Sequence, residues 1–155
     1  MAARTDTQSV TDAPSEGVRV QMIPPYTDAR GYIQTLVNYP IKNVALITSA
    51  KGTVRSNHYH REDWHYMYMI SGSAYYYYRP TGSGEPPKRI LFNKGELVYT
   101  GPMEDHTTVF LEDSMLLAMS GRPRDQETYE GDVVRVALIS EEEVNALPEL
   151  ASRSR

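Results

Sequence analysis

Short runs in which apolar and polar residues alternate dominate the chain from residue 17 onward. Val18, Val20 and Met22 alternate with polar neighbours in the first run. Similar runs follow at 33–37, 44–47, 54–60, 64–70, 74–79, 89–92, 97–100, 107–111 and 115–119. Successive side chains of a strand point to opposite faces, so this pattern predicts a series of half-buried β-strands.

Turn-forming residues separate these runs. Gly72 interrupts the apolar residues around 70, the segment 80–87 contains three prolines and two glycines, and Asn93-Lys94-Gly95 forms another break. Such a density of glycine and proline is incompatible with the interior of a sheet. Many short strands joined by such turns favour an all-β sandwich or jelly-roll barrel over a sheet covered by helices.

The two ends of the chain differ from this pattern. Residues 1–16 are polar, contain few apolar side chains, and are expected to form a disordered leader. At the other end, Ser140 followed by Glu143 forms a capping box, and Val144 and Leu147 follow at helical spacing. We therefore expect a barrel domain at 17–139 and a short C-terminal helix with its tail at 140–155.

Composition narrows the classes of function. The 155 residues include no cysteine, which excludes disulfides, thiolate metal sites and thiol nucleophiles. The net charge of −4 is mild and the basic residues are scattered, so nucleic acid is not an expected partner. Neither a secretory signal nor an apolar run of about 20 residues is evident, which predicts a cytoplasmic protein without a membrane span.

The four histidines are the strongest chemical signal in the sequence. His58 and His60 are two residues apart, and on a strand they point to the same side. His65 rejoins them if residues 61–63 form a tight hairpin, and His106 begins another predicted strand. The spacing therefore directs several imidazoles toward one point.

The region around these histidines resembles the cupin family. Gly52, His58-Tyr59-His60, His65 and Gly72 match the spacing of the first cupin motif, and Gly95, Gly101-Pro102 and His106 are similar to the second. The resemblance covers about residues 44–120. It departs from the family in two places, since His65 replaces a glutamate ligand and the glycine and proline at 101–102 stand in reversed order.

This resemblance implies a cupin jelly-roll β-barrel that binds one divalent transition metal (Fe, Mn, Ni, Co or Zn) through His58, His60, His65 and His106. Four neutral ligands leave the charge of such an ion uncompensated, which would make it a stronger Lewis acid that favours anionic oxygen donors. The alternative that the histidines act as hydrogen-bonding groups, or as acid and base without metal, stays open.

Alternation assigns further side chains to the barrel interior or exterior. Met67 and Met69 share the face of His65 and should point inward. Arg55 falls on the face opposite His58 unless a bulge intervenes. Of the four tyrosines at 75–78, two should line the interior and two the exterior, where we expect a contact in a homodimer.

Several polar residues near the motifs are weaker candidates. Asp63, Tyr99 and Glu104 are candidates for hydrogen bonds to the imidazoles, although residues of this kind are more often solvated surface groups. The charged segment 121–131 would either close over the barrel mouth, reach a neighbouring subunit or form a solvated loop.

Three functions are compatible with the sequence. The first is a metal-dependent enzyme, of dioxygenase or isomerase type, that acts on a small oxygen-rich metabolite with Tyr76 or Tyr99 as acid or base. A weaker resemblance of residues 28–31, 43–44 and Arg55 to the sugar-nucleotide isomerases and epimerases of the cupin superfamily implies a metal-independent enzyme instead. The third is a non-catalytic module that binds a sugar or another small molecule.

Overall fold

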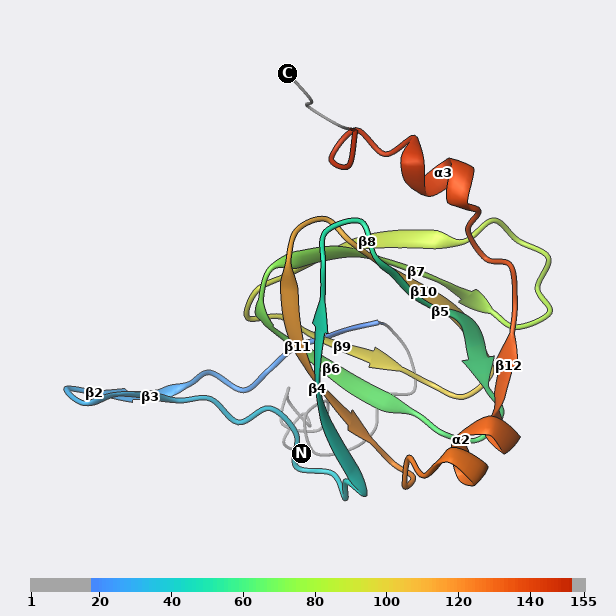
Figure 1. Cartoon of the computed structure of the whole chain (residues 1–155). Coiled ribbons are helices and arrows are strands. Elements are labelled where there is room, and N and C mark those ends of the chain that lie inside the picture. Colours follow the sequence, from blue (N-terminus) through green and yellow to red (C-terminus); the bar gives the residue numbers. More distant parts are fainter. Residues whose placement is uncertain (1–17, 152–155) are drawn as a thin grey trace, which may run out of the picture.

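Two five-stranded antiparallel sheets make up most of the computed structural model, which describes residues 18–151 (Figure 1). The first sheet has the order β1 (Arg19–Val20), β9 (Leu97–Thr100), β6 (His65–Ser71), β11 (Ser114–Ser120) and β4 (Asn43–Ser49). The second has the order β12 (Val133–Arg135), β5 (Val54–His60), β10 (Glu104–Phe110), β7 (Ser73–Pro80) and β8 (Lys88–Asn93). The expected leader 1–16 and the end of the tail, 152–155, lie outside the described residues.

The core lies between the two sheets. Its fully buried side chains come from both, and they include Met69, Tyr76, Phe92, Phe110 and Leu116. Met67 belongs to the same cluster, so the inward orientation predicted for Met67 and Met69 is confirmed. The alternation read from the sequence thus produces the predicted barrel, because each strand buries one face against the opposite sheet.

The connection between β5 and β6 differs from the expected hairpin. β5 pairs with β10 and β12, whereas β6 pairs with β9 and β11. Residues 61–64 therefore cross from one sheet to the other, and the prediction of a tight antiparallel return at 61–63 is wrong. His65 reaches the other histidines from the opposite wall of the barrel.

The N-terminal part of the described chain forms an arm with a hairpin. β2 (Tyr26–Asp28) and β3 (Gly31–Ile33) pair with each other and project from the barrel (Figure 1). The strand expected at 33–37 exists only at its first residue, because Leu36 and Val37 pack instead, as irregular chain, on the outer face of the first sheet. Apolar spacing alone did not distinguish a strand from a packed arm.

Two short helices complete the part of the chain that the structure describes. α3 (Glu141–Asn145) begins at the predicted capping box, and Val144 and Leu147 pack on the outer face of the second sheet. α2 (Gln126–Asp132) was not expected, because its segment has no apolar face at helical spacing. It begins at Asp125, whose side chain accepts a hydrogen bond from the backbone of Thr128.

The tyrosines at 75–78 alternate as predicted, and the C-terminal segment covers much of the outer pair. Tyr76 and Tyr78 belong to the barrel core, whereas Tyr75 and Tyr77 lie under the C-terminal segment of the same chain. Of the surface that we expected at a dimer interface, Tyr77 is therefore buried and Tyr75 is half-buried within the same chain.

Within residues 18–151, neither helix is long and apolar enough to cross a membrane.

Candidate active site

A cavity of about 190 Å³ opens at one end of the barrel, between the two sheets. One part of its wall is apolar and is formed by Ile47, Met67, Phe110, Leu116 and Ala118. The other part is polar and includes Arg55, His58, His60, His65, Arg124 and Tyr129. A small ligand in this cavity would meet basic and aromatic groups on one side and a hydrophobic wall on the other.

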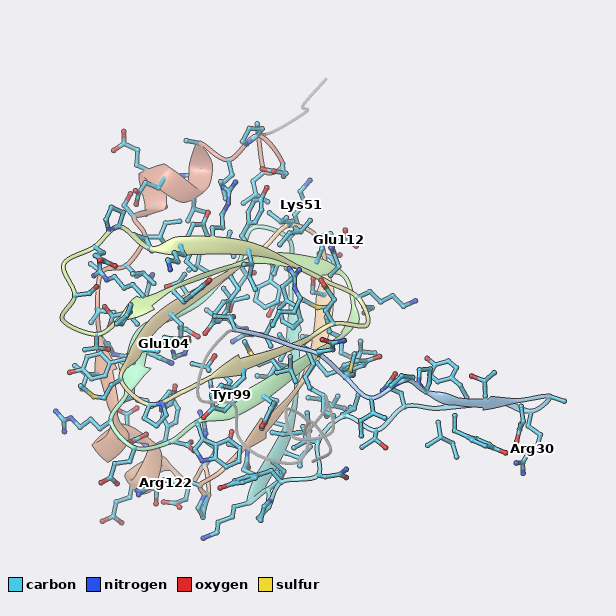
Figure 2. The ribbon with its side chains drawn as sticks, turned by 180° about the vertical axis from the view of Figure 1, so that it is seen from behind. Arg30, Lys51, Tyr99, Glu104, Glu112 and Arg122 are labelled. Carbon is cyan, nitrogen blue, oxygen red and sulfur yellow. The ribbon has the colours of Figure 1, made fainter. Side chains whose placement is uncertain are left out.

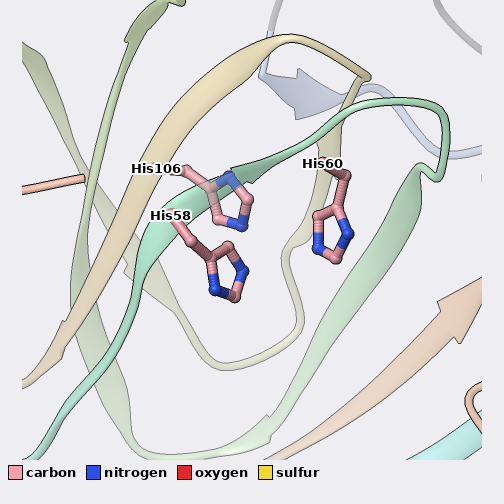
Figure 3. A group of neighbouring side chains, drawn as sticks. All are labelled: His58, His60 and His106. Carbon is pink, nitrogen blue, oxygen red and sulfur yellow. The ribbon is translucent and has the colours of Figure 1, made fainter. Parts of the chain in front are cut away.

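Three of the four histidines place their ring nitrogens close enough together to bind one metal ion. The nearest ring nitrogens of His58, His60 and His106 all lie within 4.8 Å of each other (Figure 3). His65 is adjacent but stands outside this set, with its ring centroid 5.4 Å from that of His106 and 5.8 Å from that of His60. We predicted that all four imidazoles converge. In the structure, three of them form a close group and His65 lies beside it.

Hydrogen bonds fix the protonation of two of these rings. Nδ1 of His60 lies 3.0 Å from a carboxylate oxygen of Asp132, and Nδ1 of His106 lies 2.9 Å from the backbone oxygen of Glu104. Because both partners only accept, each Nδ1 carries the proton and each Nε2 keeps its lone pair. Both Nε2 atoms are buried and have no hydrogen-bond partner among residues 18–151. Two unpaired buried acceptors directed into one group are the arrangement that a metal ion or a substrate proton would satisfy.

The imidazoles are neutral at physiological pH. Burial, reinforced by the neighbouring imidazoles, lowers the pKa of His58 to about 2. Burial also lowers the pKa of His106 to about 4 and shifts the pKa of His60 and of His65 downward. A neutral imidazole is the form that binds a metal or accepts a proton.

A bulge in β5 places Arg55 in the cavity. Ser56 and Asn57 have positive φ angles of 82° and 54°, and the register with β10 shifts between His106 and Thr107. The extra residue reverses the alternation, so Arg55 and His58 both line the cavity. The guanidinium is held by Ser49 Oγ at 2.7 Å and by the backbone oxygen of Thr48 at 2.9 Å. The prediction that Arg55 points to the face opposite His58 is therefore wrong. A bulge was the stated exception to that prediction, and β5 contains one.

The segment 121–131 closes over the cavity, which was one of the three expectations for it. Arg124 places Nη2 3.4 Å from Nδ1 of His65 and Nε 3.0 Å from Asp63 Oδ2. The guanidinium carbon of Arg124 lies 5.2 Å from the centroid of the Tyr129 ring, which itself stands 6.0 Å from the His60 ring and 6.4 Å from the His58 ring. Sequence reasoning missed Tyr129, because nothing in a charged segment distinguishes a tyrosine that faces a cavity.

The two tyrosines proposed from the sequence as acid or base do not line this cavity. The hydroxyl of Tyr76 is buried between Thr100 Oγ1 at 2.6 Å and Glu104 Oε1 at 3.0 Å. Tyr99 packs on the outer face of its sheet against Tyr66. Alternation explains the position of Tyr99, since it is adjacent on β9 to Thr100, whose side chain meets Tyr76 inside the barrel. We therefore replace Tyr76 and Tyr99 by Tyr129 as the tyrosine of the site.

The polar partners of the imidazoles also differ in part from those expected. Glu104 supports His106 through its backbone oxygen, while Asp63 pairs with Arg124. Asp132 is the carboxylate that contacts His60, and it also accepts hydrogen bonds from the backbone of Glu62 and Asp63. Asp132 lies 72 residues from His60 in the sequence, so no local motif could identify the pair.

Comparison with known proteins identifies the fold. No model of a protein family and no curated protein matches the chain. Among solved structures, the 3,4-ketoisomerase QdtA from Thermoanaerobacterium thermosaccharolyticum, in complex with TDP, is 24% identical over 74% of this chain and 83% of its own, with a TM-score of 0.60. A 3,4-ketoisomerase from Helicobacter canadensis is 20% identical over 74% and 86% of the two chains, with a TM-score of 0.62.

A more distant structure has the same architecture. The dTDP-4-dehydrorhamnose 3,5-epimerase from Sulfolobus tokodaii is 17% identical over 67% of this chain and 69% of its own, with a TM-score of 0.56. The protein is thus a jelly-roll barrel with a histidine-lined cavity. It has the cupin fold, in the form that these sugar isomerases and epimerases share.

Proposed function

We propose that this protein is an isomerase or epimerase that transfers a proton at the carbon next to the carbonyl group of a keto-sugar. The observation that carries the proposal is the buried His60–Asp132 pair, whose free imidazole nitrogen belongs to a cavity that also contains a tyrosine and two arginines. The printed activities of the structural neighbours, 3,4-ketoisomerase and 3,5-epimerase, support the same class of reaction.

The residues divide into three roles. Nε2 of His60 accepts the proton from carbon, and the carboxylate of Asp132 stabilises the imidazolium that results. The guanidinium of Arg55 or Arg124 stabilises the negative charge that develops on the carbonyl oxygen. The hydroxyl of Tyr129 returns a proton to carbon. A proton delivered to the former carbonyl carbon isomerises the sugar, provided that the hydroxyl proton of the adjacent carbon passes to the former carbonyl oxygen. A proton delivered to the opposite face of the carbon that lost its proton epimerises that carbon.

The size of the cavity supports entry of the sugar rather than of a whole nucleotide. Its 190 Å³ is less than the roughly 300–1,000 Å³ of cavities that enclose drug-sized ligands. A sugar ring would occupy the cavity while any nucleotide attached to it lies outside the mouth.

Solvent exchange tests this proposal directly. Purified protein in D₂O should incorporate deuterium next to the carbonyl of TDP-4-keto-6-deoxyglucose, the ligand printed for one QdtA complex, as followed by proton NMR. His60→Asn should slow exchange about 10³-fold and Tyr129→Phe about 10²-fold, since acid–base groups contribute about 10²–10⁴-fold. Tyr59→Phe is the matched control, because Tyr59 lies between the two histidines of β5 but does not line the cavity. Absence of exchange with this and related keto-sugars would reject the assignment.

A second proposal, metal binding, is favoured by the unpaired Nε2 atoms of His60 and His106. These atoms and His58 supply three neutral imidazole ligands, with Nδ1 of two rings already held by oxygen acceptors, and this donor set fits one divalent transition metal. His65 would be a fourth ligand after a small movement of its ring. Iron, manganese, nickel, cobalt and zinc all accept such ligands, and a bound ion would polarise the carbonyl of the substrate.

Metal analysis separates the two proposals. If the ion is resident, elemental analysis of purified protein should find about one equivalent, and added Co²⁺ should give visible absorption bands that His60→Ala abolishes. Deuterium exchange that persists in protein stripped by chelator would reject metal dependence and leave the proton-transfer proposal intact.

A further inference from the structure

The contact between Arg124 and His65 fixes which nitrogen of the His65 ring carries a proton. Nη2 of Arg124 lies 3.4 Å from Nδ1 of His65. A guanidinium only donates, so Nδ1 of His65 has to accept. Burial lowers the pKa of His65, which keeps the ring neutral. A neutral ring whose Nδ1 accepts a hydrogen bond carries its one proton on Nε2.

A buried carboxylate in turn holds Arg124 in place. Nε of Arg124 lies 3.0 Å from Oδ2 of Asp63, which is 3% exposed. The second oxygen of Asp63 accepts a hydrogen bond from the backbone N–H of Trp64 at 2.8 Å. The guanidinium cannot turn away from His65 without leaving this buried carboxylate unpaired, which is costly. Arg124 is therefore a fixed donor to His65.

His65 is thereby the opposite of the two histidines that have a proton on Nδ1. His60 and His106 keep a lone pair on Nε2, because oxygen atoms accept from their Nδ1. His65 lines the same cavity and has an N–H at Nε2. It also belongs to the other sheet, and its ring centroid lies 5.8 Å from that of His60. The cavity thus has a proton acceptor on one wall and a hydrogen-bond donor on the other.

We propose that the Nε2–H of His65 donates a hydrogen bond to the carbonyl oxygen of the keto-sugar, so that His65 is a further catalytic residue. This role rests on the proton transfer proposed above. When Nε2 of His60 takes the proton, the electrons of the C–H bond form a carbon–carbon double bond, and the π electrons of the carbonyl group move to its oxygen. The N–H of His65 stabilises the charge on that oxygen, and its proton stays on nitrogen.

The positions of the two rings suit these roles. The carbonyl oxygen and the hydrogen that leaves are on adjacent carbons, so the groups that bind them have to lie close together, as His60 and His65 do. Arg124 is a positioning residue in this arrangement. Its N–H keeps the proton of His65 on Nε2, and its positive charge makes that proton a better donor.

The same contact distinguishes His65 from the three histidines of the close group. A histidine that binds a metal through Nε2 has its proton on Nδ1, which is where Arg124 already directs an N–H. Two donors cannot share this position. His65 would have to lose its contact with Arg124 in order to bind a metal, whereas as a donor to the substrate it keeps that contact.

Three variants of His65 separate a donor from a metal ligand. Glutamine can both accept from Arg124 and donate, glutamate has nearly the same shape but no N–H, and leucine can do neither. In the deuterium-exchange assay, loss of one donor to a developing oxyanion costs about 10²–10³-fold, so His65→Glu and His65→Leu should lower kcat about 10²-fold with little change in KM, whereas His65→Gln should stay within about tenfold of the unaltered protein. Equal losses in the glutamine and leucine variants, or full activity of the glutamate variant, overturn the proposal.

Long-range ¹⁵N NMR tests the tautomer of His65 without any substrate. The unaltered protein should show the proton on Nε2, and Arg124→Leu should remove this preference. Arg122→Leu is the matched control, because Arg122 belongs to the same segment and pairs with Glu62 but does not line the cavity; Figure 2 shows it beside α2. A proton on Nδ1 of His65 in the unaltered protein overturns the proposal.

The exchange assay distinguishes failure of this role from failure of the proposed reaction. If the unaltered protein exchanges no deuterium with any keto-sugar, the reaction is rejected and the role of His65 with it. If the unaltered protein exchanges deuterium and a folded His65→Leu variant, as judged by circular dichroism, does so at the same rate, only the role of His65 is rejected.

Discussion

Asp132 connects three parts of the site through one carboxylate. It accepts hydrogen bonds from Nδ1 of His60 at 3.0 Å, from the backbone N–H of Glu62 at 2.7 Å and from that of Asp63 at 3.2 Å. The carboxylate thus fixes both the tautomer of His60 and the crossover between the sheets. This single side chain at the end of α2 ties the helix over the cavity to the histidines inside it.

Replacing Asp132 with asparagine should weaken both functions of the carboxylate. Hydrogen bonds to a charged group contribute about 1.5–3 kcal/mol, so Asp132→Asn should lower the free energy of unfolding by about 2 kcal/mol. The proton of His60 should no longer be held on Nδ1, and long-range ¹⁵N NMR of the imidazoles would report the change of tautomer. Glu127→Gln, on an exposed position of the same helix, is the control. An unchanged tautomer in Asp132→Asn would show that Asp132 does not position His60.

A second prediction at the scale of the residue concerns Glu104, because its carboxyl is buried. Burial raises the pKa of its carboxyl to about 7, above the ordinary value of 4.5. The folded state therefore holds a proton that the unfolded state has already lost between these two pH values, and stability contributed by Glu104 is lost as pH rises through 7. Glu104→Gln keeps an oxygen that accepts from Tyr76 but never ionises.

The glutamine variant should be more stable than the unaltered protein at pH 8, by up to about 3 kcal/mol, and the difference should disappear near pH 4.5. Thermal melts of both proteins across this range give the measurement. A difference that does not vary with pH would mean that the carboxyl is not the cause.

At the scale of the element, the bulge in β5 turns Arg55 into the cavity, and it also strains the backbone. A serine at φ 82° occupies a conformation in which Cβ is crowded, and glycine adopts it without this cost. Asn57, at φ 54°, is better suited because asparagine tolerates the left-handed region, and its side-chain oxygen accepts from Thr107 and from the backbone of Ile139.

Substitutions at Ser56 should reveal this strain. Ser56→Gly should raise the free energy of unfolding by about 0.5–1 kcal/mol, whereas Ser56→Val should lower it by more than that, since a β-branched residue opposes positive φ. Chemical denaturation with urea measures both values. Equal effects of glycine and valine would contradict the assigned bulge.

The crossover at 61–64 and helix α2 are the other elements that build the site. The crossover moves His65 to the sheet opposite His58 and His60, so imidazoles approach from both walls. α2 then places Tyr129 over them. Each element is short and has little stability of its own, so hydrogen bonds to the barrel hold it in place.

At the scale of the whole molecule, the buried neutral histidines make the folded state sensitive to acid. The pKa of His58 falls to about 2 and that of His106 to about 4, whereas unfolded histidine titrates near 6.5. Below pH 6.5 the unfolded state binds protons that the folded state excludes. The free energy of unfolding therefore decreases as the pH is lowered from 6.5. Glu104 changes stability in the opposite direction, but it is a single group, whereas the buried histidines are four.

We therefore expect metal-free protein to lose thermal stability as the pH falls from 7 to 4.5. His106→Gln should flatten this dependence while lowering stability at pH 7, because an amide does not titrate. Melting temperatures at several pH values, for both proteins, provide the test. A melting temperature that stays constant between pH 7 and 4.5 would contradict the burial of neutral imidazoles.

The position of the exposed apolar residues is also decided at the scale of the whole molecule. The sequence suggested the outer tyrosines Tyr75 and Tyr77 for a partner, but the C-terminal segment buries Tyr77 and half-covers Tyr75. The apolar residues left exposed are at the other sheet. Which apolar surface stays free depends on where distant segments of the chain pack, and local pattern does not contain that information.

The sequence by itself determined the barrel, the turns between its strands, the capped helix α3 and the approach of His58 and His60, because these depend on local periodicity and on the geometry of neighbouring residues. The tertiary structure decided the rest. It placed His65 beside rather than within the closest group of histidines, turned Arg55 into the cavity through a bulge, paired Asp132 with His60 and brought Tyr129 over the site. Each of these depends on pairing between strands or contacts between residues far apart in the chain, which alternation along one strand does not specify.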